Sequence, residues 1–116
     1  MMVELPLPPR GLHPNSRLHY QALARLKKAY KHDCWALTKE AGAKAPTEGR
    51  IRLHIEWWPR TANAYDQDGA IASMKAGLDG IALALGVDDS RFDLAPVFHM
   101  EPVKGGRVAV RLEALA

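Results

Sequence analysis

Residues 68–85 carry an apolar pattern that leaves little choice of local structure. Apolar side chains recur there at steps of three and four residues: Ile71, Met74, Leu78, Ile81 and Leu85. This spacing lines one face of a helix with about 3.6 residues per turn. Asp68 is a suitable N-cap and Gly86 a suitable C-terminal stop. We therefore predict one amphipathic helix over residues 68–85.

Candidate β-strands precede and follow this helix in the sequence. Residues 50–58 alternate apolar and polar side chains and are rich in strand formers, and residues 92–102 form a second candidate strand. Residues 107–114 alternate clearly, and residues 2–7 alternate weakly. The Gly-rich residues 103–106 are typical of a hairpin turn between the last two strands.

A second, basic helix is predicted over residues 18–43, where an apolar stripe repeats at helical steps and Asn15 or Ser16 can serve as the cap. The element order is then β-α-β-α-β-β. This order predicts an α+β fold, a two-layer domain with a small mixed sheet and two helices on one face. The strands on either side of the second helix should run parallel. With 116 residues we expect a single domain, residues 1–116.

Composition narrows the class of protein. Hydrophobic residues make up 47% and charged residues 25%, which is typical of a soluble globular domain. The sequence has no apolar run of about 18 residues, and the start of the chain lacks the pattern of a signal peptide, so we expect no membrane association. The single cysteine, Cys34, excludes an internal disulfide and indicates a cytoplasmic protein. Because Cys34 falls in the apolar stripe, we interpret it as a packing residue.

Charge is distributed unevenly along the chain. Residues 10–50 contain nine Lys or Arg and three acids, whereas residues 60–101 contain three Lys or Arg and seven acids. Such an asymmetry is compatible with a polyanion bound by the basic half and a metal bound by the acidic half. The alternative is that the basic residues only keep a helix face soluble.

Acidic residues gather around the helix of residues 68–85, together with one lysine. They are two aspartates before it, a Lys–Asp pair within it and two aspartates after it: Asp66, Asp68, Lys75, Asp79, Asp88 and Asp89. Carboxylates suit magnesium, which takes one or two of them together with substrate phosphate oxygens. A nearby lysine can neutralise charge that develops on a phosphate.

The same residues also have a purely structural interpretation. Asp66 and Asp68 can form a turn and cap, Lys75 and Asp79 an exposed pair one helical turn apart, and the last two aspartates a polar loop. On spacing alone this is the commoner outcome, because charge clusters are usually solvated faces.

A series of motifs spans nearly the whole chain in a fixed order. It comprises a proline pair and Pro14-Asn15-Ser16-Arg17-Leu18-His19 before a basic helix, then Asp66-Gln67-Asp68, Lys75 with Asp79, Asp88-Asp89, and Lys104-Gly105-Gly106-Arg107. In this order and spacing the chain resembles the RusA family of Holliday junction resolvases, particularly its phage and prophage members.

The resemblance implies an activity and a site. Asp66, Asp68 and Asp89 correspond to the acidic magnesium ligands of the family, and Lys75 to its essential lysine. RusA-like proteins are homodimeric endonucleases that cut four-way DNA junctions by paired symmetric nicks, so we expect a catalytic role for these four residues. The sequence leaves open whether one or two metal ions act and whether manganese substitutes.

Contacts with DNA phosphates are expected from the basic first helix and the segment before it. The candidate residues are Arg10, Asn15, Arg17, Arg25, Lys27, Lys28 and Lys31. One departure from the family stands out, because Gly69 replaces the asparagine of its D-x-D-N pattern. The alternative function is therefore a catalytically impaired module that binds branched DNA without cutting it.

Overall fold

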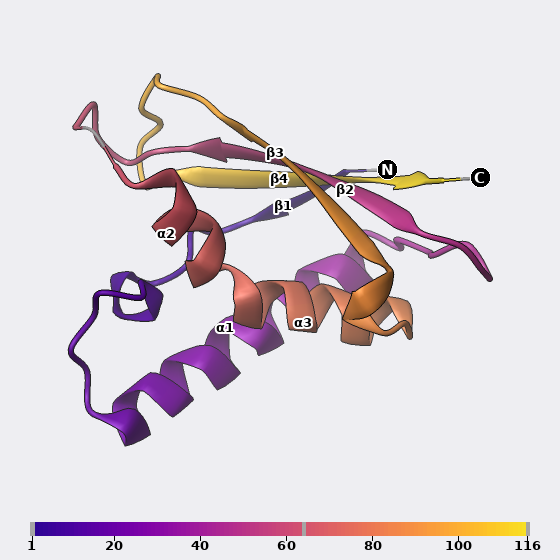
Figure 1. Ribbon diagram of the computed structural model, residues 1–116, viewed down its shortest axis with the longest axis horizontal. Helices are drawn as coiled ribbons and strands as arrows, with labels where there is room; N and C mark the ends of the chain where they lie inside the picture. Colours follow the sequence, from indigo (N-terminus) through magenta and orange to yellow (C-terminus); the bar gives the residue numbers. More distant parts are fainter. Residues whose placement is uncertain (1, 64, 116) are drawn as a thin grey trace.

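The computed structural model describes residues 2–63 and 65–115 (Figure 1). In chain order the described elements are β1 (Met2–Leu5), α1 (Tyr20–Glu40), β2 (Ile51–Trp58), α2 (Gln67–Ser73), α3 (Lys75–Leu85), β3 (Phe92–Phe98) and β4 (Arg107–Ala114). Two short 3-10 turns accompany them, η1 (Arg10–Leu12) and η2 (Asp89–Arg91). Within these residues no helix is both long enough and apolar enough to cross a membrane.

The strands form one mixed sheet in the order β1-β4-β2-β3. β2 pairs with β3 in parallel and with β4 in an antiparallel direction, and β4 also pairs antiparallel with β1. The helices lie together on one face of the sheet, so the molecule has two layers (Figure 1). The predicted α+β architecture with a mixed sheet is confirmed, and so is the parallel pairing across the second helical region.

The turn at residues 103–106 does not join a hairpin, and that prediction is wrong. The turn itself is tight, because the N–H of Gly106 donates to the carbonyl oxygen of Val103 at 2.8 Å. Gly105 and Gly106 have φ angles of 76° and 72°, which glycine adopts readily. However, β2 lies between β3 and β4, so this connection passes from one side of β2 to the other. A Gly-rich turn reverses the chain locally but does not choose the neighbour of the following strand.

The helix expected over residues 68–85 is interrupted at Met74, so the structure has α2 and α3 in its place. Met74 has φ −85° and ψ −4° and is fully buried. Just before it, the hydroxyl of Ser73 donates to the carbonyl oxygen of Ala70 at 2.6 Å. Such a side-chain hydrogen bond competes with the helical backbone and favours a bend.

Helix starts and strand ends differ from the predicted ones by a few residues. His19 caps α1 in place of Asn15 or Ser16, because its ring accepts a backbone N–H of the first turn. Asp66 caps α2 in place of Asp68. β1 and β3 end earlier than predicted, whereas β4 has the predicted bounds.

The core lies between the sheet and the helices. β2 contributes every second side chain to it, and Ile51, Leu53 and Ile55 are fully buried. α1 contributes Tyr30 and Cys34, which confirms that Cys34 is a packing residue. Burial raises the pKa of the Cys34 thiol to about 11, so it is not a thiolate at neutral pH.

Two glycines let α3 lie directly against α1. A Cβ atom at Gly77 would lie 2.6 Å from Cε2 of Tyr30. A Cβ atom at Gly80 would overlap the carbonyl oxygen of Lys31 and would lie 3.1 Å from the backbone nitrogen of Trp35. The neighbour at Gly80 is backbone, which cannot rotate away. Only glycine therefore allows this distance between the two helices.

We expect Gly80→Ala to lower the free energy of unfolding by about 1–3 kcal/mol, because the added methyl group pushes α1 and α3 apart. This loss outweighs the better helix propensity of alanine, and urea unfolding followed by circular dichroism measures it. Leu83→Ala is the control in the same helix, since Leu83 is 58% exposed and its removal should cost about 0.5 kcal/mol or less. A Gly80→Ala variant as stable as the parent would contradict the close packing.

Candidate functional site

Lys75 is the centre of an ion-pair cluster at the first position of α3. Its Nζ atom donates to Oδ1 of Asp79 at 2.8 Å and also to Oδ2 of Asp89 at the start of η2. These two hydrogen bonds, with that to Asp79 the stronger cause, raise the pKa of Lys75 to about 12. The lysine side chain is 65% exposed, so a charged ammonium group faces solvent at neutral pH.

Asp88 has a structural role beside this cluster. Its side chain accepts the N–H of Ser90 at 2.8 Å and caps η2. That backbone hydrogen bond lowers the pKa of Asp88 from its usual value. Asp88 thereby stabilises the turn from which Asp89 reaches Lys75.

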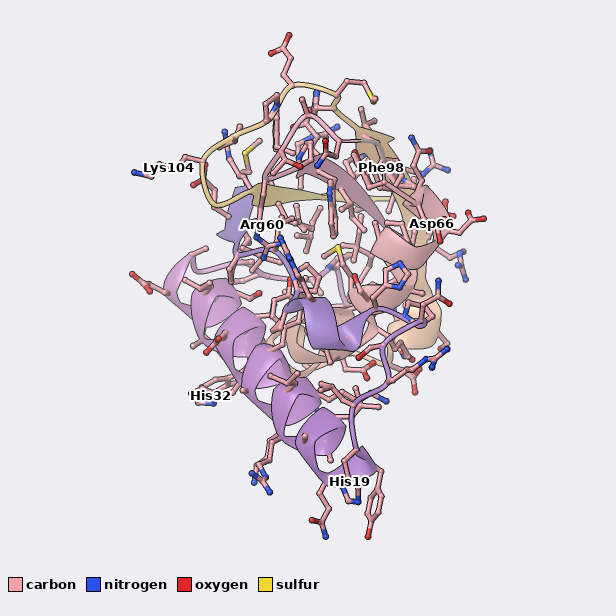
Figure 2. The ribbon with its side chains drawn as sticks, turned by 90° about the vertical axis from the view of Figure 1, so that its left-hand side faces the viewer. His19, His32, Arg60, Asp66, Phe98 and Lys104 are labelled. Atoms are coloured by element: carbon pink, nitrogen blue, oxygen red, sulfur yellow. The ribbon has the colours of Figure 1, made fainter. Side chains whose placement is uncertain are left out.

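Asp66 caps α2 at the periphery of the molecule (Figure 2), and Asp68 lies in the first turn of the same helix. Oδ1 of Asp66 accepts the N–H of Asp68 at 3.1 Å, which is the capping interaction of this helix. The Asp66 side chain is still 57% exposed, and Asp68 is exposed as well. The structural interpretation of the sequence is thus confirmed for the cap and for the Lys75–Asp79 pair.

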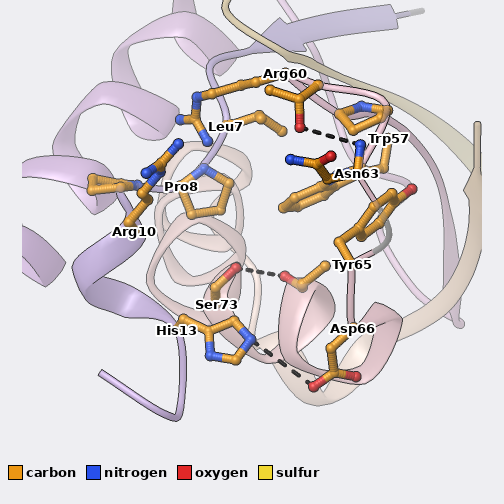
Figure 3. Close-up of a pocket in the computed structure, with 14 residues that line it drawn as sticks. Leu7, Pro8, Arg10, His13, Trp57, Arg60, Asn63, Tyr65, Asp66 and Ser73 are labelled. Carbon is orange, nitrogen blue, oxygen red and sulfur yellow. Dashed lines mark hydrogen bonds and ion pairs between the residues drawn. The ribbon is translucent and has the colours of Figure 1, made fainter. Parts of the chain in front are cut away.

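His13 is a candidate functional residue that the sequence analysis missed. Its Nε2 atom lies 3.9 Å from Oδ2 of Asp66 (Figure 3). Its Nδ1 atom accepts the N–H of Asn15 at 3.1 Å, so a neutral ring carries its hydrogen on Nε2, facing the carboxylate. No local pattern indicates this contact, because the two residues are far apart in the sequence and His13 stands among turn-forming residues.

Gly69 provides the space that His13 occupies. A Cβ atom at Gly69 would overlap Nε2 of His13 and would lie 2.8 Å from Oδ2 of Asp66. Gly69 is itself buried in the first turn of α2. The glycine at this position of the D-x-D-N pattern therefore accompanies an imidazole beside Asp66, where an asparagine side chain would collide with it.

The predicted metal ligands fall into two places. Asp66 and Asp68 lie within one turn of α2, whereas Asp89 is bound by Lys75. Among residues 2–63 and 65–115, no group of three or more His, Cys, Asp and Glu side chains is arranged to hold a metal ion. Magnesium usually takes only one or two protein carboxylates, so the chemistry of the exposed Asp66–Asp68 pair fits this ion. The three-carboxylate site stays a prediction.

A groove of about 620 Å³ separates α1 from the turn between α2 and α3. One wall carries Lys27, Lys28 and Lys31 of α1, and the other carries Lys75 and Asp79 of α3. Three of the lysines predicted to bind DNA therefore share a groove with the predicted essential lysine. The groove is predominantly cationic, which suits a chain of phosphates.

The other residues predicted to contact DNA lie outside this groove. Asn15, Arg17 and Arg25 are exposed, on the segment before α1 and on its early turns. Arg10 lines a separate pocket beside His13 and Asp66. The structure thus collects the lysines of α1 at one groove and distributes the remaining candidates over the neighbouring surface.

Comparison with known proteins finds a relative that covers nearly all of this chain. A protein of Xylella fastidiosa (strain Temecula1), described only as uncharacterized, is 33% identical over 114 residues, which cover 96% of this chain and 74% of the relative. The chain belongs to the family of this Xylella protein. Its description assigns no activity to the family, and no protein-family model matches the chain. The resemblance to RusA resolvases therefore stays a prediction from the sequence motifs.

We expect Gly69→Ala to move the His13 ring away from Asp66 while the fold survives, because the colliding atom is the end of a side chain that can rotate. The free energy of unfolding should change by no more than about 1 kcal/mol. Nuclear Overhauser contacts between the imidazole and the first turn of α2 should disappear. Gln67→Ala, at an exposed position of the same turn, should keep them. Contacts that persist in Gly69→Ala would contradict the assignment of this space to His13.

We expect Lys75 to react with an acylating reagent more slowly than Lys104 does at alkaline pH below 10.5, because its raised pKa keeps more of the amine protonated. The difference in rate should be on the order of tenfold, and peptide mass spectrometry after brief labelling measures it. Asp79→Asn removes the main cause and should accelerate labelling of Lys75. Equal rates for Lys75 in the parent and in Asp79→Asn would show that this ion pair does not form in solution.

Proposed function

We propose that the protein is a magnesium-dependent endonuclease for branched DNA, resolving four-way Holliday junctions as its resemblance to the RusA family implies. The observation that carries this proposal is the groove with Lys27, Lys28 and Lys31 on one wall and Lys75 on the other. Phosphate contacts of this kind position a DNA backbone without reading its sequence. They suit an enzyme that recognises the branched shape of its substrate.

Lys75 is assigned an electrostatic role. Since its hydrogen bonds raise the pKa to about 12, the side chain remains an ammonium group at neutral pH and cannot serve as a general base. A fixed positive charge beside a scissile phosphate stabilises the negative charge that develops on its oxygens. A phosphate that enters the groove would replace Asp79 as a partner of Lys75.

The carboxylates are assigned to the metal. Asp66 and Asp68 would bind magnesium directly, and Asp89 would complete the ligand set with Lys75 as its hydrogen-bond partner. The chemistry that bound magnesium supplies is Lewis-acid stabilisation of charge on the scissile phosphate. His13 Nε2 lies 3.9 Å from Oδ2 of Asp66, which is beyond hydrogen-bond distance, so His13 would orient this metal ligand only once the two groups move closer together.

The proposed oligomeric state and cellular location follow from the proposed substrate. A four-way junction presents two equivalent strands, so paired symmetric nicks require two sites related by a two-fold axis. We therefore propose a homodimer with one groove for each subunit. The proposed place of action is the cytoplasm of a bacterial or phage-infected cell, where such junctions form.

A second candidate function is a junction-binding module without catalysis. One observation favours it: Asp89, a predicted metal ligand, is engaged by Lys75. In this alternative the groove binds phosphates, whereas the carboxylates only cap α2 and balance the charge of Lys75.

We expect the purified protein to make paired symmetric nicks in a synthetic four-way junction with end-labelled strands. Cleavage should require magnesium, stop in EDTA and spare a linear duplex of the same sequence. Asp68→Asn should reduce the cleavage rate by roughly a hundredfold or more while junction binding persists, because a metal ligand is lost but the lysines remain.

Asp33→Asn is the matched control, since it makes the same change at an exposed position of α1 outside the groove. It should cut at the parent rate. Binding of the junction by the parent without any nick would establish the second candidate. An Asp68→Asn variant that cuts as fast as the parent would overturn the metal assignment.

A further inference from the structure

A second cavity lies between η1, the end of β2 and α2, and the proposed function gives a role only to Asp66 and His13 among its lining residues. Its volume is about 330 Å³, and it is drawn in Figure 3. Ligand pockets usually measure about 300–1,000 Å³, so this one suits a single small ligand and not a longer segment of chain. It shares His13 and Asp66 with the candidate site, so a molecule bound here would touch that site.

One part of the cavity is lined by apolar and aromatic side chains. Trp57 and Tyr65 line it with ring planes that differ by 25° and centroids 6.4 Å apart, and Pro8 also lines the cavity. The hydroxyl of Tyr65 donates to the carbonyl oxygen of His99 at 3.1 Å, which fixes the ring before any ligand arrives. Trp57 is only 8% exposed, so a planar ring would contact chiefly the partly exposed Tyr65 ring, by stacking or edge contact.

The opposite part of the cavity is cationic. Arg10 and Arg60 line it, and Figure 3 shows their guanidinium groups on the same side of the cavity in this view. In the part of the chain that the structure describes, neither guanidinium makes a hydrogen bond or an ion pair. Other arginines are engaged, for example Arg52 with Asp93 at 2.9 Å and Arg50 with the carbonyl oxygen of Phe92 at 2.9 Å. The two cavity arginines are therefore free to bind an anion bidentately.

A polar group lies between these two parts. The side chain of Asn63 lines the cavity and offers both donors and an acceptor. The ligand that matches all three features carries a phosphate, a planar ring and hydrogen-bonding groups on the edge of that ring. A nucleoside monophosphate has this composition.

We propose that this cavity binds one nucleotide unit of the DNA substrate, with its base against Trp57 and Tyr65 and its phosphate at Arg10 and Arg60. This inference rests on the proposed function in taking DNA as the source of the nucleotide. Taking a base out of the stack costs a few kcal/mol and costs least where the base is already unpaired, so the nucleotide in such a cavity would be one that the protein extrudes or finds unpaired beside the crossover. The bound nucleotide would place the adjoining phosphates of its strand next to Asp66.

The test is a binding titration of the full chain in EDTA, with isothermal calorimetry as the readout. The ligands are the four deoxynucleoside 5′-monophosphates, the corresponding deoxynucleosides and inorganic phosphate. We expect the monophosphates to bind about tenfold or more tightly than either fragment, because they engage both parts of the cavity. Arg60→Gln should weaken monophosphate binding by about tenfold or more.

Arg111→Gln is the matched control, because Arg111 is exposed on β4 and does not line the cavity. It should leave the affinity within about twofold. Circular dichroism checks that both variants are folded. Inorganic phosphate that binds as tightly as the monophosphates, or an Arg60→Gln variant that binds them as the parent does, would overturn the nucleotide assignment.

A second arm identifies the source of the nucleotide. A single-stranded trinucleotide should bind through its central base, and the same trinucleotide with an abasic centre should bind about tenfold more weakly. Monophosphate binding without trinucleotide binding would overturn the assignment to DNA and indicate a free nucleotide. Monophosphate and trinucleotide binding without junction cleavage would leave the cavity assignment intact and overturn the nuclease. Junction cleavage without monophosphate binding would leave the nuclease intact and overturn the cavity assignment.

Discussion

The backbone contact between Gly80 of α3 and Lys31 of α1 determines how the groove is built. A carbonyl oxygen occupies the space that a Cβ atom would need, so the helices reach this distance only at a glycine. The crossing brings the exposed face of α1 beside the start of α3. Lys27 and Lys28, one turn earlier in α1, then line the same groove as Lys75. The electrostatics of the candidate site therefore depend on an uncharged residue in the helix interface.

Charge within the groove is balanced by partners that are easy to replace. Lys75 donates to two aspartates, and the lysine and both acids are more than a third exposed. Exposed ion pairs contribute only about 0–1 kcal/mol each to stability, because water and salt screen them. The ammonium group can thus exchange a carboxylate for a phosphate at little cost. The contact of Asp66 is equally easy to replace. The His13 ring beside it is partly exposed and lies 3.9 Å away.

The sequence predicted the elements whose signals are local. The alternation in β2, the apolar stripe of α1 and the bounds of β4 all follow from side chains a few residues apart. The interruption at Met74 was missed because the apolar stripe continues through it, while the bend involves a hydroxyl of the preceding residue. The neighbour of β4 was predicted wrongly because a turn carries no information about a strand that comes earlier in the chain.

The candidate site was also predicted only in part, because only some of its residues have a local sequence signal. The acidic residues and Lys75 were found from composition and motif order, and their roles in catalysis stay predictions. His13 was not found, because its contact with Asp66 joins two distant segments through the space left at Gly69. The cavity of Arg10, Trp57 and Arg60 was missed for the same reason, since its walls come from three separate parts of the chain. Spacing in sequence identifies residues on one element, whereas sites between elements require the packing to be known.

The position of β4 has a consequence for biosynthesis. This strand is the last in the described chain, yet it lies between β1 and β2 and provides the pairing partner for both. While the chain is emerging from the ribosome, β1 has no neighbour and one edge of β2 stays open until residues 107–114 have left the exit tunnel. Open strand edges are sites of unwanted association, and distant strand pairing is slow. The nascent chain therefore exposes these strand edges until β4, the last described strand, has been synthesised.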